Sequence, residues 1–510
     1  MSQQVTFGQF AFDRAKRTLW SNSALVPLGS HGAALLEALL DAEDGVVTKT
    51  ELIDRAWPGR IVEDGNLAVQ ISGLRKTLGL HPSGQEWIIT VPRVGYRFLQ
   101  EGDVGAMPLV RPSIAVLPFA NLGGNPADDY FADGLVEDLI IALSRFRTFA
   151  VVTRHASFVY KNRRVDTRKA AAELGVRYAL EGSVRRSDRR VRVTAQLIEA
   201  SSGASLWAER LEGKVEDIFD FQDQITERVI GFVEPQIRKA EIVRSRRKRA
   251  ENLDAYDLYL QALPLIQSAN IAGYSVAIEL LNRAIELDPA FAPVLALACW
   301  AHGKRHARGG IAPSGVDDLR SCRDFAERAL AADSDDAVVL AIAGSELRCF
   351  DSESERGCAL VERAFELNPN SNLVSNLAGF ARASRGDWEA AIQCHQRALL
   401  LCPGAPERFW SLTGIAQACL SARRPDEALE WARKSLDAYD GLDWTYSVAA
   451  AAYGMTGDWE NARLALKAAL ALHPTWTPGD VAGHAPMEAR ALLIEGFGDL
   501  QRERSTLRLA

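Results

Sequence analysis

The chain has 510 residues, of which 47% are apolar and 25% are charged, and its formal net charge at pH 7 is −7. This composition is that of an ordinary globular protein, and the length suggests about three or four domains. The negative balance excludes a basic field along the whole chain, so any binding of nucleic acid must belong to one domain.

The cysteines and the apolar runs indicate the compartment. The seven cysteines lie between Cys299 and Cys419, and no two form a C-x-x-C pair. Their odd number argues against a disulfide framework or a zinc module and favours buried thiols in a reduced chain. No uncharged apolar run reaches 18 residues, and MSQQVTFGQF lacks the basic start and apolar core of a signal peptide. We therefore expect a cytoplasmic protein without a membrane span.

The first unit, residues 1–102, is predicted to begin with strands and continue with helices. The alternating run VTFGQFAFDRAKRTLW predicts paired strands, and HGAALLEALLDAE predicts a short amphipathic helix. A second helix is predicted in VVTKTELIDRAWPG, with Thr48 as its cap and Glu51 three residues later. The last run, EWIITVPRVGYRFLQ, predicts a hairpin that turns at 92–95.

A third helix is predicted in EDGNLAVQISGLRKTLG, residues 63–79. Its opposite face is small and polar and ends in the basic pair Arg75-Lys76. Such a face suits a helix laid in a major groove, where base edges are read by hydrogen bonds and apolar contacts. Four apolar residues, spaced four, three and four positions apart, share the buried face. They are Leu67, Ile71, Leu74 and Leu78.

Residues 5–100 resemble the winged-helix DNA-binding domain of the OmpR/PhoB type, an output domain of phosphorelay regulators. The resemblance rests on ELIDRAWPG, NLAVQISGLRKTLG and ITVPRVGYRF, which occur in that order at the family's separations. It implies that the third helix reads double-stranded DNA and that the hairpin is a wing reaching toward the minor groove. The residues expected to contact DNA are Asn66, Val69, Gln70, Ser72, Arg75, Lys76, Thr90, Arg93 and Tyr96.

The residues expected at the DNA backbone and at the groove have different roles. Arg75, Lys76 and Thr90 are expected to contact phosphates, which fixes the register but reads little sequence. Arg93, at the tip of the wing, suits a narrow and strongly negative groove. An alternative for Arg75 and Lys76 is the end of an ordinary solvated helix, where cations interact favourably with the helix dipole.

The charge of this unit predicts how it binds. Residues 1–102 hold ten Lys or Arg against eleven Asp or Glu, a formal charge of −1, and several arginines common in the family are absent. Few cations mean that few counterions are released on binding, so a single copy should bind weakly. We expect specific binding by a homodimer, with two or more copies on repeated half-sites.

The loop PGRIVED corresponds to the loop through which this family can touch RNA polymerase. The candidates for that contact are Arg60, Glu63 and Asp64, and an ordinary turn between helices is the alternative. We expect no receiver domain before this unit. The expected layout is therefore similar to one-component regulators of the CadC/HilA kind, but without a membrane helix.

A linker and a second domain are predicted next. Residues 103–112 are rich in Gly and Pro and are predicted to be the linker. Residues 113–235 are predicted to form a small mixed α/β domain. Strands are predicted in SIAVLPF, FAVVT, RYALEGSVRR, RVRVTAQLIEA and SLWAERLEG, and helices in YFADGLVEDLIIALSRF, TRKAAAELGV and DIFDFQDQITERVIGFV. Residues 236–252 are predicted to form a charged, solvated connector helix, with a nucleic-acid patch as the alternative.

This second domain resembles the TolB-like amino-terminal domain found in such regulators and in some nucleotide cyclases. The resemblance rests on SIAVLPFANL, DDYFADGLVEDLI and YALEGSVRR. It implies a sensing or interaction role and no known chemistry. The Gly-rich NLGGNPADD lacks the Lys-Ser/Thr of a phosphate-binding loop and is interpreted as an ordinary loop.

Residues 253–510 are predicted to form helical repeats. GDWEAAIQCHQRALLLCP, RRPDEALEWARKSLDAYD and GDWENARLALKAALALHP align at spacings of 37 and 34 residues, a period that indicates a stacked solenoid. The lines are similar to tetratricopeptide repeats, which implies a concave groove for an unknown protein, peptide or small ligand. Trp388 and Trp459 are expected to pack between helices, with a role as groove anchors as the alternative.

The sequence favours a regulator over an enzyme. His302 and His306 are spaced like two metal ligands, but their surroundings, GKRHARGG, are basic, so neither a metal nor a cofactor is expected. We predict a multidomain α+β chain: winged helix-turn-helix, small α/β domain, all-α solenoid. Its expected function is sequence-specific transcription regulation, as an activator, with sensing in the C-terminal part. The alternative is a tetratricopeptide scaffold or adaptor whose winged helix is a docking domain.

Overall fold

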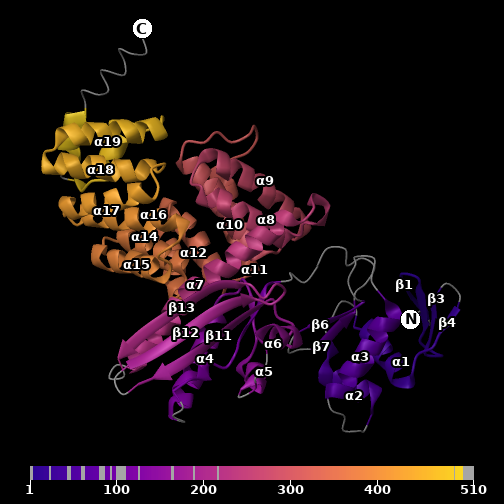
Figure 1. Ribbon diagram of the computed structural model, residues 1–510. Coiled ribbons are helices and arrows are strands. Elements are labelled where there is room, and N and C mark those ends of the chain that lie inside the picture. Colours follow the sequence, from indigo (N-terminus) through magenta and orange to yellow (C-terminus); the bar gives the residue numbers. More distant parts are fainter. Residues whose placement is uncertain are drawn as a thin grey trace. The chain divides into compact units, whose positions relative to one another are not determined.

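The computed structural model describes residues 4–21, 24–42, 47–58, 64–79, 87–91, 95–98, 111–123, 127–161, 163, 166–187, 190–214, 218–487 and 489–497. The chain divides into two compact units, Met1–Val110 and Arg111–Ala510. Figure 1 draws the first in indigo and the second in the later colours of the chain.

Unit 1 contains two small sheets and three helices. One sheet is antiparallel with strand order β1-β2-β3-β4, and the other has strand order β5-β7-β6. The strands and helices predicted for this part of the chain are confirmed. Their bounds are β1 Gln4–Phe7, β2 Phe10–Asp13, β3 Thr18–Ser21, β4 Ala24–Val26, α1 Ser30–Leu40, β5 Val47–Thr48, α2 Lys49–Ala56, α3 Asp64–Leu78, β6 Ile88–Val91 and β7 Gly95–Phe98.

Two local features set the geometry of unit 1. The predicted cap of α2 is confirmed: the Glu51 backbone N–H donates to Thr48 Oγ1 at 3.3 Å, and the Glu51 carboxylate accepts from the Thr48 backbone N–H at 2.9 Å. At Gly95, a Cβ atom would lie 1.9 Å from the backbone oxygen of Val47. A glycine is therefore required where β7 passes β5, at the base of the predicted wing.

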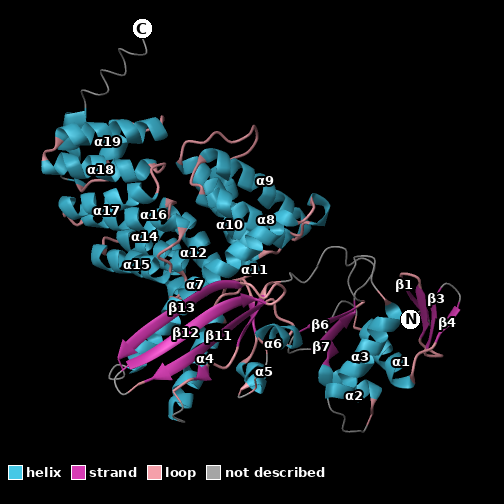
Figure 2. Ribbon diagram, viewed as in Figure 1, coloured by secondary structure: helices cyan, strands magenta, loops and turns pink. Residues whose placement is uncertain are grey.

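The α/β part of unit 2 is a mixed sheet covered by helices. Its strand order is β10-β8-β11-β12-β13, with β9 paired to β11, and the long strands β11 to β13 are antiparallel (Figure 2). Helices α4 and α7 contribute to the apolar core against this sheet. The bounds are β8 Ser113–Val116, β9 Ala120–Asn121, α4 Ala127–Leu143, β10 Ala150–Val151, α5 Arg154–Ser157, α6 Thr167–Glu173, β11 Tyr178–Arg186, β12 Arg190–Glu199, β13 Ser205–Lys214 and α7 Ile218–Arg247.

Helix α7 joins the sheet to the repeats. It continues through Pro235, so the boundary predicted at 235 lies inside a helix. One side of α7 packs in the core of the sheet through residues such as Val229 and Val233. The other side meets α15, where a Cβ atom at Gly231 would lie 1.8 Å from the backbone oxygen of Leu401. Because one helix serves both layers, residues 111–510 form a single compact unit.

The remaining helices form antiparallel pairs stacked in sequence order, which confirms the predicted solenoid (Figure 1). None of the helices among the described residues combines the length and apolar character needed to cross a membrane. The bounds are α8 Ala255–Gln267, α9 Ile271–Leu287, α10 Ala292–Ala307, α11 Asp318–Ala332, α12 Ala337–Leu347, α13 Ser354–Leu367, α14 Asn372–Ser384, α15 Trp388–Leu401, η5 Pro406–Arg408, α16 Phe409–Ser421, α17 Pro425–Ala438, α18 Asp443–Thr456, α19 Trp459–Leu472 and α20 Pro478–Ala482.

The repeated Gly-Asp-Trp motif is a turn between paired helices. Gly386 and Gly457 have φ of +82° and +83°, a conformation that glycine adopts without strain. The next residue, Asp387 or Asp458, caps the following helix by accepting a backbone N–H of its first turn. The repeat period seen in the sequence is therefore a repeat of this turn.

Candidate functional site

Helix α3 presents two different faces. Its predicted apolar stripe is confirmed, because each of the four residues is at most 2% exposed. The opposite face is exposed and small or polar, and Val69 on it is 68% exposed. A single exposed apolar side chain is ordinary on a protein surface, so it is the small and polar character of the whole face that distinguishes it. The exposed residues of this face are Asn66, Ala68, Val69, Ser72, Gly73 and Lys76, with Gln70 half-buried beside them.

The two basic residues at the end of α3 have different environments. The Nε–H of Arg75 donates to the backbone oxygen of Ile88 at 2.8 Å, so this half-buried side chain ties α3 to strand β6. Lys76 is exposed and has no ion-pair partner among the described residues. The phosphate contacts of Arg75 and Lys76 both stay predictions; Lys76 could make one without breaking an ion pair among the described residues, whereas Arg75 already donates to Ile88.

Three other cations of unit 1 are neutralised by acids. Arg14 and Arg55 both pair with Asp41, at 3.1 and 3.0 Å, and Arg17 pairs with Glu37 at 2.7 Å. The weak formal charge of this unit is therefore not offset by a cluster of unpaired arginines in its described part. Lys76, by contrast, is an exposed cation of α3 that no acid of the described part neutralises.

The remaining predicted contacts have mixed outcomes. Tyr96 is 7% exposed and its ring lies in the apolar core of unit 1, so little of it is available to a partner, and its DNA contact stays a prediction. Thr90 pairs with Tyr96 in the β6–β7 register, but its side chain lies outside the described part. Asp64 begins α3, and nothing of its side chain is described. Arg60, Glu63 and Arg93 also lie outside the described residues.

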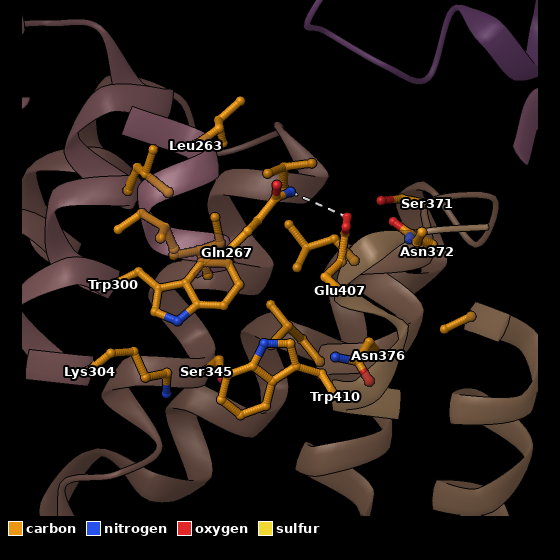
Figure 3. Close-up of a pocket in the computed structure, with 18 of the residues that line it drawn as sticks. Leu263, Gln267, Trp300, Lys304, Ser345, Ser371, Asn372, Asn376, Glu407 and Trp410 are labelled. Carbon is orange, nitrogen blue, oxygen red and sulfur yellow. Dashed lines mark hydrogen bonds between the residues drawn. The ribbon is translucent and has the colours of Figure 1, made fainter. Parts of the chain in front are cut away.

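A second candidate site is a cavity of about 530 Å³ in unit 2. It is lined by residues of helices α8, α10, α12, α14 and α16, with further residues from α7, α9, α15 and α18. Its wall is largely aromatic. In Figure 3 the Trp300 and Trp410 rings project into the same space from opposite walls. The other tryptophans that line it are Trp444 and Trp476.

Most charges in the cavity wall are paired with each other. The Lys304 ammonium contacts Glu346 at 2.7 Å, and Arg238 contacts Glu407 at 3.2 Å. Burial lowers the pKa of Lys304, but the Glu346 carboxylate outweighs this and raises the pKa above its usual value. The Glu407 carboxylate also accepts from Gln267 at 3.3 Å (Figure 3).

A buried histidine fixes the orientation of an asparagine in the wall. The His395 ring lies between Gly379 and Gly414, where a Cβ atom at either position would come within 2.6 Å of it. Burial lowers the pKa of His395 to about 3, so the ring is neutral at pH 7. Asn376 Oδ1 accepts from His395 Nδ1 at 2.8 Å and from Ser411 Oγ at 2.9 Å. The Asn376 nitrogen is thereby turned toward the Trp410 side of the cavity (Figure 3).

The first and last repeats touch each other beside the cavity. Ala269, in the turn after α8, is fully buried against Phe409 and Leu442. Polar contacts join the same two ends of the solenoid. They are Arg308 Nη2 to Asp443 Oδ1 at 2.8 Å, His473 Nε2 to the Ala307 oxygen at 3.3 Å, and Tyr439 Oη to the Ser268 oxygen at 3.0 Å.

The sequence did not reveal this cavity or its residues. Trp459, which stands in the repeated motif, packs against Phe497, as expected of a packing residue. His302 is buried and contacts Asp318 at 2.6 Å, while His306 is exposed. The described residues contain no group of three or more His, Cys, Asp or Glu side chains that could hold a metal ion.

Comparison with known families finds three stretches of the chain that match a family model. Residues 23–98 match the model "Transcriptional regulatory protein, C terminal". Residues 110–228 match the second domain of HilA/YgeH-like transcriptional regulators, and residues 370–441 match a tetratricopeptide repeat. This is the domain combination of a DNA-binding transcriptional regulator with C-terminal repeats. The resemblance of the middle part to a TolB-like domain stays a prediction.

Curated relatives match parts of the chain. It is 42% identical over 182 residues to "Putative adenylate cyclase 3" of Rhizobium meliloti, covering 36% of this chain and 31% of that protein. It is 33% identical over 96 residues to the "Cholera toxin homolog transcriptional activator" of Vibrio parahaemolyticus, covering 18% and 33%. It is 29% identical over 112 residues to the "Cholera toxin transcriptional activator" of Vibrio cholerae, covering 21% and 38%. The chain thus spans about a third of the length of these relatives.

Solved structures also match in part. The DNA-binding domain of CpxR from E. coli is 20% identical with a TM-score of 0.19, covering 20% of this chain and all of that one. A tetratricopeptide protein of Thermus thermophilus, TTC0263, is 20% identical with a TM-score of 0.30, covering 38% and 98%.

Proposed function

We propose that the chain is a one-component transcriptional regulator that binds double-stranded DNA through α3. The observation that carries the proposal is the pair of faces of this helix: a fully buried apolar stripe and an exposed, small, polar face with Val69 and Lys76 outward. A helix of this kind can lie close to base edges because no bulky side chain holds it away. The family match over residues 23–98 supports the same reading.

The proposed contacts divide by chemistry. Asn66, Gln70 and Ser72 offer hydrogen bonds to base edges, and Val69 offers an apolar contact to a thymine methyl group. Lys76 neutralises a phosphate. Since this is a small number of cations, we propose that a homodimer binds two half-sites, which doubles the counterion release.

We further propose that the chain activates transcription. Two relatives that share part of this chain are named as transcriptional activators. An activator that touches RNA polymerase would use the loop before α3, where Arg60, Glu63 and Asp64 are the candidates.

The proposed role of unit 2 is sensing. The 182-residue match to the protein named as an adenylate cyclase is longer than unit 1, so part of it must lie beyond residue 110. We interpret the shared stretch as a regulatory domain that occurs with different output domains in different proteins. We propose no cyclase chemistry for this chain.

The proposal can be tested by replacing one exposed residue of α3. Val69→Glu places a negative charge on the proposed DNA face without disturbing the core, because the side chain is 68% exposed. Leu25→Glu, at a position that is 57% exposed on β4, adds the same charge elsewhere. Fluorescence anisotropy of the full chain with DNA selected from a random library would be measured at two salt concentrations.

We expect Val69→Glu to abolish selective binding and Leu25→Glu to keep it. Binding of the wild type should also weaken steeply as salt rises, because phosphate contacts release counterions. Equal binding by both variants would place the contact elsewhere, and no selective DNA binding by the wild type would favour a scaffold that acts through its repeats.

A further inference from the structure

We propose that the cavity of unit 2 binds a small aromatic carboxylate, a planar apolar ring system carrying one negative charge. Binding itself is independent of any DNA activity. The regulatory consequence, that this ligand is the signal of the regulator, rests on the function proposed above.

The size and walls of the cavity fit a planar apolar molecule. Its volume of about 530 Å³ is within the range of sites for small ligands, which run from about 300 to 1,000 Å³. Four tryptophans line it, together with Phe380 and tyrosines of α8 and α9. Aromatic walls gain most from another ring, through stacked or edge-to-face contacts.

The closure of the solenoid favours a compact ligand over an extended chain. An extended peptide needs a groove that is open along its length. Here the first and last repeats are joined by the Arg308–Asp443 ion pair and by the burial of Ala269 against Leu442. The Arg308 and Asp443 side chains are 13% and 4% exposed, so the junction is itself part of the packed interior.

The charge balance of the wall indicates one negative group on the ligand. Lys304, Arg308 and Arg238 are each paired with a carboxylate. Arg348 also lines the cavity, and its guanidinium has no ion-pair partner among the described residues. A carboxylate is the group that a guanidinium binds best. The acids of the wall, Glu407 and Asp443, each already pair with an arginine, although the buried Oε2 of Glu407 has no hydrogen-bond partner in the described part of the chain, so the cationic probe is included in the test below.

A second donor is held ready near the tryptophans. Asn376 has its oxygen occupied by His395 and Ser411, which leaves its amide nitrogen for the cavity. The nitrogen can donate to a ring substituent or to the second oxygen of the carboxylate. Because its partners are buried, this donor is preorganised and needs no rearrangement on binding.

The cavity is placed to pass a signal to the α/β layer. Its wall includes Ile237 and Arg238 of α7 and Phe149 at the edge of the sheet. A ligand in it therefore contacts the repeats and the α/β layer at once. Filling the cavity would fix the position of α7 between them.

The test is isothermal titration calorimetry on the full chain without DNA. The probes are benzoate, 4-hydroxyphenylacetate, indole-3-acetate and 1-naphthaleneacetate, each compared with its neutral amide, and 1-naphthylmethylamine as the cationic probe. Three variants are compared with the wild type: Arg348→Gln, Trp410→Leu, and Arg320→Gln as a control. Arg320 is an exposed cation of α11, with 81% of its side chain accessible.

We expect at least one acid to bind more tightly than its amide and than the amine. Arg348→Gln should weaken the acid by about 10- to 100-fold, the usual range for a charge-assisted hydrogen bond, and leave the amide unchanged. Trp410→Leu should weaken the acid and the amide alike, and Arg320→Gln should change neither. Circular dichroism of each variant distinguishes loss of binding from loss of fold.

Several outcomes would overturn the proposal. Equal affinity for acid and amide, or tighter binding of the amine, would exclude a carboxylate as the recognised group. No binding of any acid at millimolar concentration, or an acid that binds Arg348→Gln as well as the wild type, would also contradict it. DNA binding is measured separately, so failure here leaves the proposed regulator standing, and failure of DNA binding leaves the ligand site standing.

Discussion

Arg75 and Lys76 are neighbours in the chain, but their side chains have different environments in the fold. Arg75 points back to the Ile88 carbonyl and holds α3 against the wing strand, while Lys76 points to solvent. A sequence motif cannot distinguish the two environments, because both residues are basic and both lie in the last turn of the same helix. The difference depends on the position of β6, which begins ten residues after α3 ends.

This difference predicts the effect of removing Lys76. Lys76→Ala should weaken DNA binding about equally for all sequences and lower the slope of log affinity against log salt by about one, because one phosphate contact is lost. The measurement is anisotropy over a series of salt concentrations. Lys16→Ala, an exposed cation in the turn after β2, is the matched control and should leave the slope unchanged. An unchanged slope for Lys76→Ala would contradict this role.

His395 predicts a pH dependence of the repeats. Burial holds its pKa at about 3, below the ordinary value of 6.5. The unfolded chain therefore takes up this proton at a higher pH than the folded chain does. The free energy of unfolding is therefore unaffected by His395 above about pH 6.5 and decreases as pH falls toward 3. The decrease is about 2 kcal/mol at pH 5.

The matched variant is His395→Phe, which keeps a ring between the two glycines and removes the titrating group. Urea unfolding followed by circular dichroism at pH 7 and pH 5 should show a larger loss of stability for the wild type than for the variant. Parallel losses in the two proteins would show that His395 is not the group responsible.

At the scale of the element, α3 combines a structural face with a binding face. Leu67→Ala removes a fully buried side chain and should cost about 2–5 kcal/mol, the usual range for a cavity-forming change. Val69→Ala, two residues away and exposed, should change stability by less than about 0.5 kcal/mol. Hydrogen exchange of residues 64–78 in the full chain measures both. Equal exchange in the two variants would contradict the assignment of faces.

The junction between the first and last repeats can be tested in the same way. Asp443→Ala leaves the Arg308 guanidinium buried without its acid and should cost about 3–5 kcal/mol. The double variant Arg308→Met/Asp443→Ala should recover part of that loss, because it removes the unpaired charge as well. Urea unfolding gives the energies, and small-angle X-ray scattering should show an expanded solenoid in the single variant. A compact single variant of unchanged stability would show that the junction does not hold the repeats together.

The elements of this chain could be predicted well from sequence because their signals are local. The 4-3-4 spacing of apolar residues correctly predicted which face of α3 is buried, and Thr48 with Glu51 correctly predicted where α2 begins. The burial of Tyr96 could not be predicted, because a resemblance gives the position of a residue in a motif and not the direction in which its side chain points. Its burial depends on packing against the rest of unit 1.

The cavity could not be predicted because no local pattern encodes it. Trp300 and Trp410 are more than one hundred residues apart and meet through the curvature of the stacked helices. The recurring motif points to Trp388 and Trp459, which do not line the cavity, and Trp459 packs against Phe497. The residues that line the cavity differ from repeat to repeat.

In the whole molecule, we propose that a DNA-reading unit is joined to a unit with a closed solenoid. In the described part of the first unit, three of the arginines are paired with acids, which would limit the affinity of a single copy for DNA. We therefore propose that selective binding needs two copies on DNA and that unit 2 controls their pairing. The expected signature is a binding site with two repeated half-sites. Footprinting of a single isolated half-site at equal affinity would contradict it.

Reading of DNA by α3 can be tested by selection from a random DNA library with the full chain, in parallel with the variant Asn66→Ala/Gln70→Ala/Lys76→Ala. We expect the wild type to enrich one motif with repeated half-sites and the variant, folded by circular dichroism, to enrich none. If the variant enriched the same motif as the wild type, α3 would not be the reading helix. If neither enriched any sequence, the chain would not read DNA under these conditions and the proposed function would be wrong.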